Sequence, residues 1–426
     1  MAETVYIYDG ARTPFLRARG APGPFSASDL AIACGAPLLL RQPFEPPLFD
    51  EMILGCAMPG ANEPNIGRVV ALRLGLGLET PAWTVMRNCA SGLQAIDSAA
   101  ANIALGKSEL VLAGGTDALS RSPLLLSDKM TRWFAQLQKA RTPWQKAMHI
   151  MRLPLGELKP VIGLLQGLTD PIVNLNMGQT AENLAFRFQI SREEADAFAL
   201  QSHQKVERAQ KEGHLAEIVP IMDTHGVSYR ADDGVRPDTT MEKLARLKPV
   251  FDRFGTVTAG NSSQITDGAA LLVLANGKIG KKLGLKPMSK IVDCAWAALD
   301  PAYMGLGPVH AIATLLQRNK LELDDIDIFE INEAFAAQVL ACLKAMEDAD
   351  YAKERLGLNK PLGTLDQAKL NVDGGAVAIG HPVGASGARI TLHLAQTLKR
   401  LNKKRGIASL CIGGGQGGAI LLENMD

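Results

Sequence analysis

The sequence has few of the features that mark secreted, nucleic-acid-binding or membrane-spanning proteins. Its 426 residues include six cysteines with no C-x-x-C pair among them, so we expect neither a disulfide framework nor a metal site. The net charge of +1 gives no reason to expect a nucleic acid as partner. No apolar run reaches the roughly 20 residues that span a bilayer, and the N-terminus has no signal-peptide or transit-peptide character. We therefore expect a cytoplasmic protein.

The composition is that of a globular enzyme, with 47% hydrophobic and 21% charged residues. The length predicts about two or three domains, and a faint internal repeat supports this organisation. Ala90-Ser91-Gly92 precedes a helix-like stretch, a strand and two glycines, and Ala385-Ser386-Gly387 precedes the same order of elements. Together with strands and helices that alternate along the chain, the repeat indicates a duplicated α/β architecture.

Cys89 is the first candidate for a catalytic residue. It lies in TVMRNCASGLQ, where a short apolar run ends and apolar positions from Leu93 onward recur with helical spacing. A cysteine at a strand-to-helix turn is close to the positive end of the helix dipole, which favours the thiolate over the thiol. By itself, however, a lone cysteine is more often a small buried core residue.

Three further residues supply the groups that a cysteine nucleophile needs. They are Asn332 in INEAFAAQVL, His381 in AIGHPVGASGARI and Cys411 in ASLCIGGGQGGAILL. A histidine can take the thiol proton, and a second acid/base is needed when a carbon–carbon bond is made or broken. An asparagine can hold a water or a carbonyl oxygen, and the glycines let backbone N–H groups face a developing oxyanion. The glycines at 413–418 do not indicate NAD binding, because they lead into another strand rather than a helix.

With these motifs the chain resembles the thiolase family. NCASG, NEAF, GHPVGASGAR and CIGGGQG match the four signature blocks of that family in order, and the similarity runs from Val5 to Glu423. The resemblance implies that Cys89 is the acylated nucleophile and His381 its activating base. It also implies that Cys411 is the acid/base that protonates or deprotonates the methyl carbon of acetyl-CoA.

The resemblance implies roles for the neighbouring residues as well. Asn332 would hold a catalytic water that forms one oxyanion hole with His381, and the N–H groups of Cys89 and Gly413 would form the other. Glu333 would support these residues without reacting itself. No metal or redox cofactor is implied, because coenzyme A is a substrate.

The fold that the resemblance implies is a duplicated α/β fold of two similar βαβαβαββ halves. They form a five-layered α-β-α-β-α arrangement with an inserted loop domain over coenzyme A, and their central helices meet at the active site. In the loop domain, Ser191 and Glu194 predict a capping box at the start of a helix that stops at Gly213. The expected parts are an N-terminal half at 1–118 completed by 250–275, a loop domain at 119–249 and a C-terminal half at 276–426.

Two blocks of the chain match segments that touch the pantetheine arm of coenzyme A in thiolases. They are MGQTAEN, which begins at Met177, and AGNSS, which ends at Ser263. Ser263 matches the family serine that hydrogen-bonds this arm. Many members of the family have histidine just before MG, whereas this chain has Asn176. The sequence therefore does not decide whether the residue at this position contacts the pantetheine arm.

Residues 128–166 form a basic insertion with seven Lys or Arg and two acidic residues. Apolar residues, including Trp133 and Trp144, recur in it with helical spacing, which is typical of a segment on a membrane surface or a partner. An amphipathic helix packed over the active site would have the same periodicity. The insertion resembles that of the β-subunits of fatty acid β-oxidation complexes, although several of these have histidine where this chain has Asn332.

The resemblance therefore implies a thiolase that cleaves 3-ketoacyl-CoA to acetyl-CoA and a shortened acyl-CoA in fatty acid β-oxidation. The alternative is a biosynthetic acetyl-CoA C-acetyltransferase. A homodimer or dimer of dimers is expected, with a β-oxidation hydratase/dehydrogenase subunit or a membrane surface as a further contact of 128–166. Two other hypotheses are a non-catalytic assembling subunit and a decarboxylating condensing enzyme. The intact set of catalytic candidates argues against the first, and Cys411 against the second.

Overall fold

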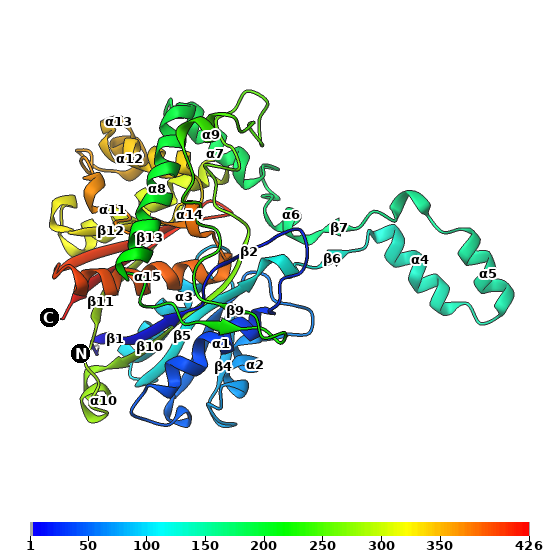
Figure 1. Ribbon diagram of the computed structural model, residues 1–426, viewed down its shortest axis with the longest axis horizontal. Coiled ribbons are helices and arrows are strands. Elements are labelled where there is room, and N and C mark those ends of the chain that lie inside the picture. The colour runs from blue at the N-terminus through cyan, green and yellow to red at the C-terminus, as the bar shows by residue number, and fades with distance from the viewer. Residues whose placement is uncertain (1–2, 426) are drawn as a thin grey trace.

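The computed structural model describes residues 3–425, in which two similar α/β halves share one ten-stranded sheet (Figure 1). The strand order is β12-β13-β14-β11-β1-β10-β5-β3-β4, with β2 beside β10. The first half contributes β1 (Val5–Arg12), β2 (Leu16–Arg17), β3 (Glu51–Gly55), β4 (Ala82–Val85), β5 (Leu110–Ala118) and β10 (Thr266–Asn276). The second half contributes β11 (Ser289–Ala298), β12 (Ile328–Ile331), β13 (Arg405–Ile412) and β14 (Gln416–Asn424).

Strand pairing repeats between the two halves. β3 and β5 are parallel in the first half, as β12 and β13 are in the second. The next two strands are antiparallel in both halves, β10 and β1 in the first and β14 and β11 in the second. Each half also has a register shift at the corresponding place, between Ile7 and Asp9 in β1 and between Ile291 and Asp293 in β11. The duplicated α/β architecture predicted from the sequence is confirmed.

Helices cover both outer faces of the strands and fill the space between the two halves. α1 and α2 pack outside the first half, and α11 and α12 pack outside the second. α3 and α15 lie in the middle, where their apolar side chains share one core with strands of both halves. The result is the five-layered order that the family resemblance implies. These helices are α1 (Ala27–Leu40), α2 (Ile66–Arg73), α3 (Ser91–Ala104), α11 (Gly307–Asn319), α12 (Ala336–Glu347) and α15 (Val383–Arg400).

The two central helices approach closely at their N-terminal ends. A Cβ atom on Gly92 would lie 2.7 Å from the carbonyl oxygen of Gly384, which leaves room only for glycine. α3 begins at Ser91, two residues before Leu93, where the apolar spacing that predicts this helix starts. Because the two helix starts meet, the turns that precede them bring Cys89 and His381 to the same region of the molecule.

The segment between β5 and β10 is built from short elements and one long helix, α8. The Ser191 Oγ accepts the Glu194 N–H at 3.1 Å, and the Glu194 carboxylate accepts the Ser191 N–H at 2.7 Å. α8 ends at Glu212 and is capped by Gly213, which has a φ of 72°. The predicted capping box and helix stop are therefore confirmed. The elements of this segment are α4 (Asp128–Lys139), α5 (Pro143–Met151), α6 (Gly163–Gly167), α7 (Met177–Arg187), α8 (Arg192–Glu212), α9 (Met241–Ala245), β6 (Leu124–Leu125), β7 (Val161–Ile162), β8 (Ile221–Met222) and β9 (Ser228–Tyr229).

Three short helices complete the described chain: α10 (Gly277–Lys282), α13 (Ala349–Tyr351) and α14 (Ala376–Ile379). α14 lies just before the loop that carries His381. No helix within residues 3–425 is both long and apolar enough to cross a membrane.

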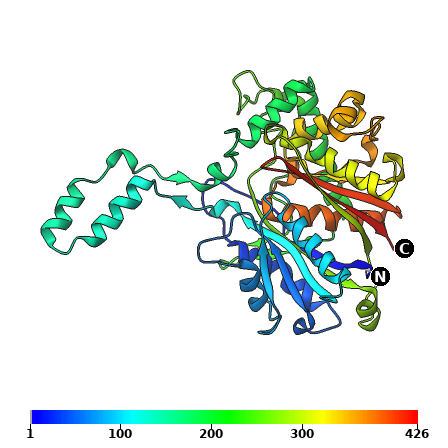
Figure 2. The ribbon, with the colours of Figure 1, turned by 180° about the vertical axis from the view of Figure 1, so that it is seen from behind.

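The basic insertion forms an arm that projects from the body of the molecule (Figures 1 and 2). Two strands, β6 and β7, pair at its base, and beyond them α4 and α5 pack against each other. The Trp133 Nε1–H donates to the carbonyl of His149 across this helix pair at 2.9 Å. The predicted helices are confirmed, and α4 and α5 do not pack over the active site.

Candidate active site

Cys89 lies in the turn between β4 and α3, as the sequence predicts. Asn88, the residue before it, has a φ of 44°. Ser91 fixes the turn, because its Oγ accepts the Arg87 N–H at 2.9 Å and donates to the Asn88 carbonyl at 2.7 Å. The Cys89 sulfur is thereby held at the N-terminal end of the central helix α3.

The surroundings of the Cys89 thiol correct one expectation from the sequence. Burial raises the pKa of this thiol, and the N–H groups of Gly413 and of Cys89 itself, which donate to the sulfur, only partly oppose that rise. The expected preference of Cys89 for the thiolate is therefore wrong. Because the neutral thiol is a weak nucleophile, the site needs a base beside it.

The end of β13 brings a second thiol to the same place. Cys411 is 1% exposed. Burial raises its pKa well above the ordinary value, and the nearby Cys89 sulfur contributes to the rise. Gly413 follows in the turn to β14, and its carbonyl accepts the Asn88 Nδ2–H at 2.8 Å. This bond joins the turn that carries Cys411 to the turn that carries Cys89.

His381 lies in the loop between α14 and α15, directly after Gly380, whose φ of 94° favours glycine. Its Nδ1 lies 2.5 Å from the Ser386 Oγ, and that hydroxyl donates to the Pro382 carbonyl at 3.0 Å. Since the hydroxyl proton is used there, the Nδ1–H is the donor to Ser386 and the Nε2 carries the free lone pair.

The Nε2 of His381 has a free lone pair that can accept a proton. The Nε2 is buried and has no partner among residues 3–425. Burial lowers the pKa of His381 to about 4, and the positive charge of Arg389 contributes to the lowering. The imidazole is therefore neutral at neutral pH, which is the state that a general base requires.

Asn332 follows directly after β12 and is 1% exposed. Its backbone N–H donates to the carbonyl of Ser409 on β13 at 2.9 Å, which fixes the position of the residue. Both polar atoms of its side chain, Oδ1 and Nδ2, are buried without a partner among residues 3–425. Because buried polar atoms in proteins are nearly always hydrogen-bonded, this amide is a candidate to bind a water or a substrate oxygen.

Glu333 holds the loop that leads to His381. One of its carboxylate oxygens accepts the Ser202 hydroxyl at 2.6 Å and the Val377 N–H at 3.1 Å, and the other accepts the Asn371 Nδ2–H at 2.9 Å. These bonds connect α8, the segment before α14 and the Asn332 loop. The side chain is 1% exposed and fully engaged, as expected for a supporting residue.

A mostly apolar cavity of about 340 Å³ opens beside Cys89. Cys89, Asn88 and Gly413 form one part of its lining, together with Met177 from the start of α7. This volume is within the usual range for small-molecule pockets. The other residues that line it are Ala57, Met58, Met86, Leu119, Leu164, Gly167, Leu168, Thr169, Asp170, Pro171, Ile172, Val383 and Gly414.

The residues that the sequence suggests for coenzyme A lie in two places. Met177 lines the cavity with Cys89. The Asn176 Oδ1 accepts the Gln179 N–H at 2.9 Å and caps α7, so this side chain has a structural partner. The Ser263 N–H donates to the carbonyl of Ala334 at 3.0 Å, which places Ser263 beside the Asn332 loop and outside the lining of the cavity.

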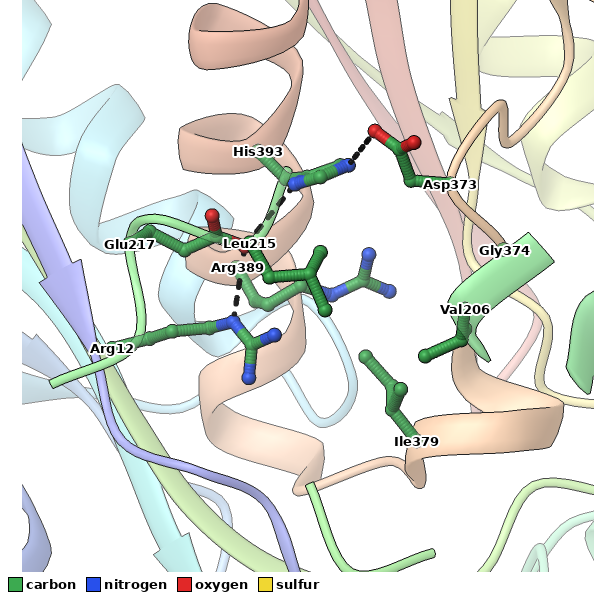
Figure 3. Close-up of a pocket in the computed structure, with 9 residues that line it drawn as sticks. All are labelled: Arg12, Val206, Leu215, Glu217, Asp373, Gly374, Ile379, Arg389 and His393. Atoms are coloured by element: carbon green, nitrogen blue, oxygen red, sulfur yellow. Dashed lines mark hydrogen bonds and ion pairs between the residues drawn. The ribbon is translucent and has the colours of Figure 1, made fainter. Parts of the chain in front are cut away.

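A buried ion network lies further along α15 (Figure 3). His393 contacts Glu217 through Nδ1 at 3.1 Å and Asp373 through Nε2 at 3.2 Å. Burial lowers the pKa of His393, but the two carboxylates outweigh it and raise that pKa to about 10. Arg12 contacts Glu217 at 3.2 Å and Asp232 at 2.7 Å. The network thus joins β1, the loop segment and the helix that follows His381.

Sequence reasoning missed Asp117, which organises the start of α15. Its carboxylate accepts the N–H groups of Met58 at 2.9 Å and Ala57 at 3.2 Å, and also that of Gly384. Burial raises the pKa of this carboxyl group, and the hydrogen bonds oppose the rise. The one acidic residue in the otherwise uncharged strand LVLAGGTDA was the signal that could have identified it. Ser386 was missed as well, although it lies inside the GHPVGASGAR block.

Comparison with known proteins identifies the family of the chain. The family model "Thiolase, N-terminal domain" matches residues 5–278, and "Thiolase, C-terminal domain" matches residues 285–424. A β-ketoadipyl-CoA thiolase of Pseudomonas aeruginosa is 39% identical, and an acetyl-CoA acetyltransferase of Allochromatium vinosum is 37% identical, each with 100% of both chains covered. The crystal structure of human mitochondrial 3-ketoacyl-CoA thiolase in complex with CoA is similar with a TM-score of 0.85 and 36% identity, covering 99% of this chain and 98% of that chain.

The fold, the paired thiols and these likenesses define an acyltransferase of the kind that uses acyl-CoA and CoA as substrates. The chain belongs to the thiolase family, as its four sequence blocks indicate.

Proposed function

We propose that this thiolase cleaves 3-ketoacyl-CoA with coenzyme A, giving acetyl-CoA and a shortened acyl-CoA, in fatty acid β-oxidation. The observation that carries the proposal is the combination of Cys89 and Cys411 in one site with a neutral histidine whose Nε2 is free. The names of relatives support the reaction type, since one of them is a mitochondrial 3-ketoacyl-CoA thiolase.

The first half-reaction forms an acyl group on Cys89. As its sulfur attacks the 3-keto carbon, the His381 Nε2 takes the thiol proton and the keto oxygen becomes an alkoxide. N–H donors and the Asn332 amide, acting through a bound water, are the groups that stabilise negative charge on oxygen. A single such donor is worth about 3 kcal/mol.

When the alkoxide collapses, the carbon–carbon bond breaks, the acyl group stays on Cys89 as a thioester, and the electron pair of the broken bond passes to the enolate of acetyl-CoA. Cys411 gives its proton to the enolate carbon and becomes a thiolate, which completes the first half-reaction. In the second half-reaction, Cys411 takes the proton of the incoming coenzyme A thiol, whose sulfur attacks the thioester on Cys89. The Cys89 sulfur leaves and takes back the proton from the His381 Nε2, which restores the enzyme. These steps require no metal or redox cofactor.

The pantetheine arm of coenzyme A is proposed to contact Ser263 and Met177. Support comes from the position of Ser263 beside the Asn332 loop and of Met177 at the Cys89 cavity. Asn176 is a weaker candidate, because its side chain already caps α7.

Acyl transfer to Cys89 is tested by incubation with acetyl-CoA and peptide mass mapping. The acetyl group is expected on the peptide that contains Cys89, and the Cys89→Ala variant should take up none. A label on Cys411 alone would reverse the roles of the two cysteines.

A biosynthetic acetyl-CoA C-acetyltransferase is the second candidate, and the likeness to the Allochromatium vinosum enzyme favours it. The apolar cavity beside Cys89 favours the degradative role, because its mostly apolar lining suits a hydrocarbon chain longer than an acetyl group. Steady-state thiolysis of acetoacetyl-CoA, compared with that of medium-chain and long-chain 3-ketoacyl-CoA, separates the two. Activity restricted to acetoacetyl-CoA would support the biosynthetic candidate.

The arm is proposed to attach the enzyme to an anionic membrane surface, with a β-oxidation hydratase/dehydrogenase subunit as the alternative partner. Its basic excess and exposed apolar side chains support this role, among them Trp144 at 73% and Met151 at 69% exposed.

A homodimer or dimer of dimers is also proposed. β4 is the last strand of the sheet, and Trp83 and Met86 beside this open edge are exposed. Light scattering after gel filtration measures this state, and a monomer would contradict the proposal. The six free cysteines agree with a reducing compartment such as the cytoplasm.

A further inference from the structure

The cavity beside Cys89 has two facing walls that belong to different parts of the chain. Met58 forms one wall, in the loop after β3, and α6 forms the other through Leu164 and Gly167. α6 lies directly after the base of the arm, so this wall is not part of either half of the central sheet.

Gly167 lies where these two walls meet. A Cβ atom built on Gly167 would have one heavy atom within 4 Å, the Met58 Cε at 3.2 Å. Gly167 has no positive φ, so its backbone accepts residues with a side chain. Any larger side chain at position 167 would therefore extend into the cavity toward the flexible end of Met58.

Both walls are held by hydrogen bonds. The Met58 N–H donates to the buried Asp117 carboxylate at 2.9 Å. The end of α6 is held by the N–H of Met177, which donates to the carbonyl of Leu168 at 2.9 Å. Met177 lines the same cavity as Cys89. This backbone hydrogen bond therefore fixes the position of the α6 wall relative to Cys89.

The chemistry of the lining suits a hydrocarbon chain. Asp170 is the only charged residue among those that line the cavity. It is 3% exposed, and its Oδ1 accepts the N–H groups of Ile172 at 2.8 Å and Val173 at 3.1 Å. No lining residue carries a positive charge that could pair with a carboxylate at the far end of an acyl group.

We propose that Gly167 and Met58 are the residues that determine how long an acyl chain this enzyme accepts. The chain of the substrate runs from the Cys89 thioester into the cavity and is stopped where these two residues meet, because a Cβ on Gly167 would already lie 3.2 Å from the Met58 Cε. This inference rests on the proposed thiolysis of 3-ketoacyl-CoA and adds to it the residues that set the chain length. Each methylene group of the acyl chain that is excluded from the cavity weakens binding of the substrate roughly fourfold.

The test compares kcat/KM for thiolysis of acetoacetyl-CoA, a medium-chain and a long-chain 3-ketoacyl-CoA in the full-length enzyme. Gly167→Leu should leave kcat/KM for acetoacetyl-CoA within about threefold of the parent value and lower kcat/KM for the long-chain substrate by ~100-fold. The added side chain crowds the cavity, and the long acyl chain also loses the contacts of its excluded methylene groups. Met58→Ala should raise the ratio of long-chain to acetoacetyl-CoA thiolysis. Combining Met58→Ala with Gly167→Leu should recover part of the long-chain activity.

Leu165→Phe is the matched control, because it adds bulk to the same helix at a 57% exposed position outside the cavity lining. It should not change the ratio between substrates. A Gly167→Leu variant that loses activity equally on all chain lengths, or on none, overturns the inference while the proposed function stands. A parent enzyme that cleaves no 3-ketoacyl-CoA, despite acetylation at Cys89, overturns the proposed function itself.

Discussion

The side chains of His381 and Ser386 are joined by a hydrogen bond of 2.5 Å between Nδ1 and Oγ, and Ser386 donates its own proton to the Pro382 carbonyl. The serine is therefore an acceptor toward His381, which keeps the proton on Nδ1 and leaves the Nε2 free for the Cys89 proton. The two residues are five positions apart in sequence, and the first turn of α15 brings them together.

We predict that Ser386→Ala slows acylation of Cys89. Without its acceptor, the imidazole can take the other tautomer, in which the Nε2 carries the proton and cannot act as base. Loss of one hydrogen bond of this kind costs about 1 kcal/mol, so acylation should slow by roughly five- to tenfold. Rapid-quench measurement of acetyl transfer from acetyl-CoA checks this. Ser386→Thr, which keeps the hydroxyl, is the control, and a parent-like rate in Ser386→Ala would contradict the assigned tautomer.

We predict that Cys411→Ser separates the two halves of the reaction. The proposed role of Cys411 is proton transfer at carbon, and a serine hydroxyl is far too weak an acid to replace it. Acyl-enzyme should still form slowly, whereas overall thiolysis should fall by at least ~100-fold, as is typical for a lost general acid/base. Near-normal turnover of this variant would refute the role.

The parts of the fold that were predictable from sequence depend on local patterns. The helix from Ser91 and the capping box at Ser191 were predicted because spacing and cap chemistry act within a few residues. The repeat around Gly92 and Gly387 indicated the duplication, because each half must place the same small residues where the central helices cross.

The parts that were not predictable depend on contacts between distant segments. Asp117 binds the start of α15 across 267 residues, and the strand around it has no sequence signature for that contact. The direction of the Cys89 pKa shift was predicted from the helix dipole alone, whereas burial by other segments determines that direction. Periodicity also could not tell whether the basic helices pack on the body or on each other.

We predict that His393 stabilises the fold in a pH-dependent way. Its folded-state pKa of about 10 is raised above the ordinary 6.5, so its contribution is fully present below pH 6.5 and is lost as the pH rises through 10. Charged groups near it include Glu217, Asp373 and Glu330. Removing one partner of a buried pair costs about 3–5 kcal/mol.

The measurement is the free energy of unfolding of the parent and of His393→Gln in denaturant at several pH values. The variant should be less stable than the parent at pH 6, and the difference should narrow as the pH approaches 10. Thr314→Ala, a change on α11 away from the network, is the control for general loss of stability. A difference that stays constant with pH would contradict a charged His393.

We predict that charge reversal in the arm weakens membrane attachment without affecting catalysis. Lys139→Glu, Arg141→Glu and Lys146→Glu together remove three positive charges and add three negative ones. The binding of the arm to vesicles should weaken, because each basic residue near an anionic surface contributes about 1 kcal/mol of electrostatic attraction. Co-sedimentation with vesicles that contain phosphatidylserine should fall steeply, while acetoacetyl-CoA thiolysis stays near the parent value. Salt should weaken the binding of the parent in the same way, since exposed charges are screened.

The matched control for the arm applies the same charge change elsewhere, at the exposed Lys281, Lys282 and Lys286 around the end of α10. If vesicle binding depends on the arm, the control variant should keep most of its binding. If binding depends only on the overall charge of the protein, both triple variants should bind vesicles equally weakly. An arm variant that binds vesicles like the parent at low salt would refute membrane attachment through the arm. In that case, co-sedimentation of the parent with a hydratase/dehydrogenase subunit, lost only in the arm variant, would identify a protein as the partner.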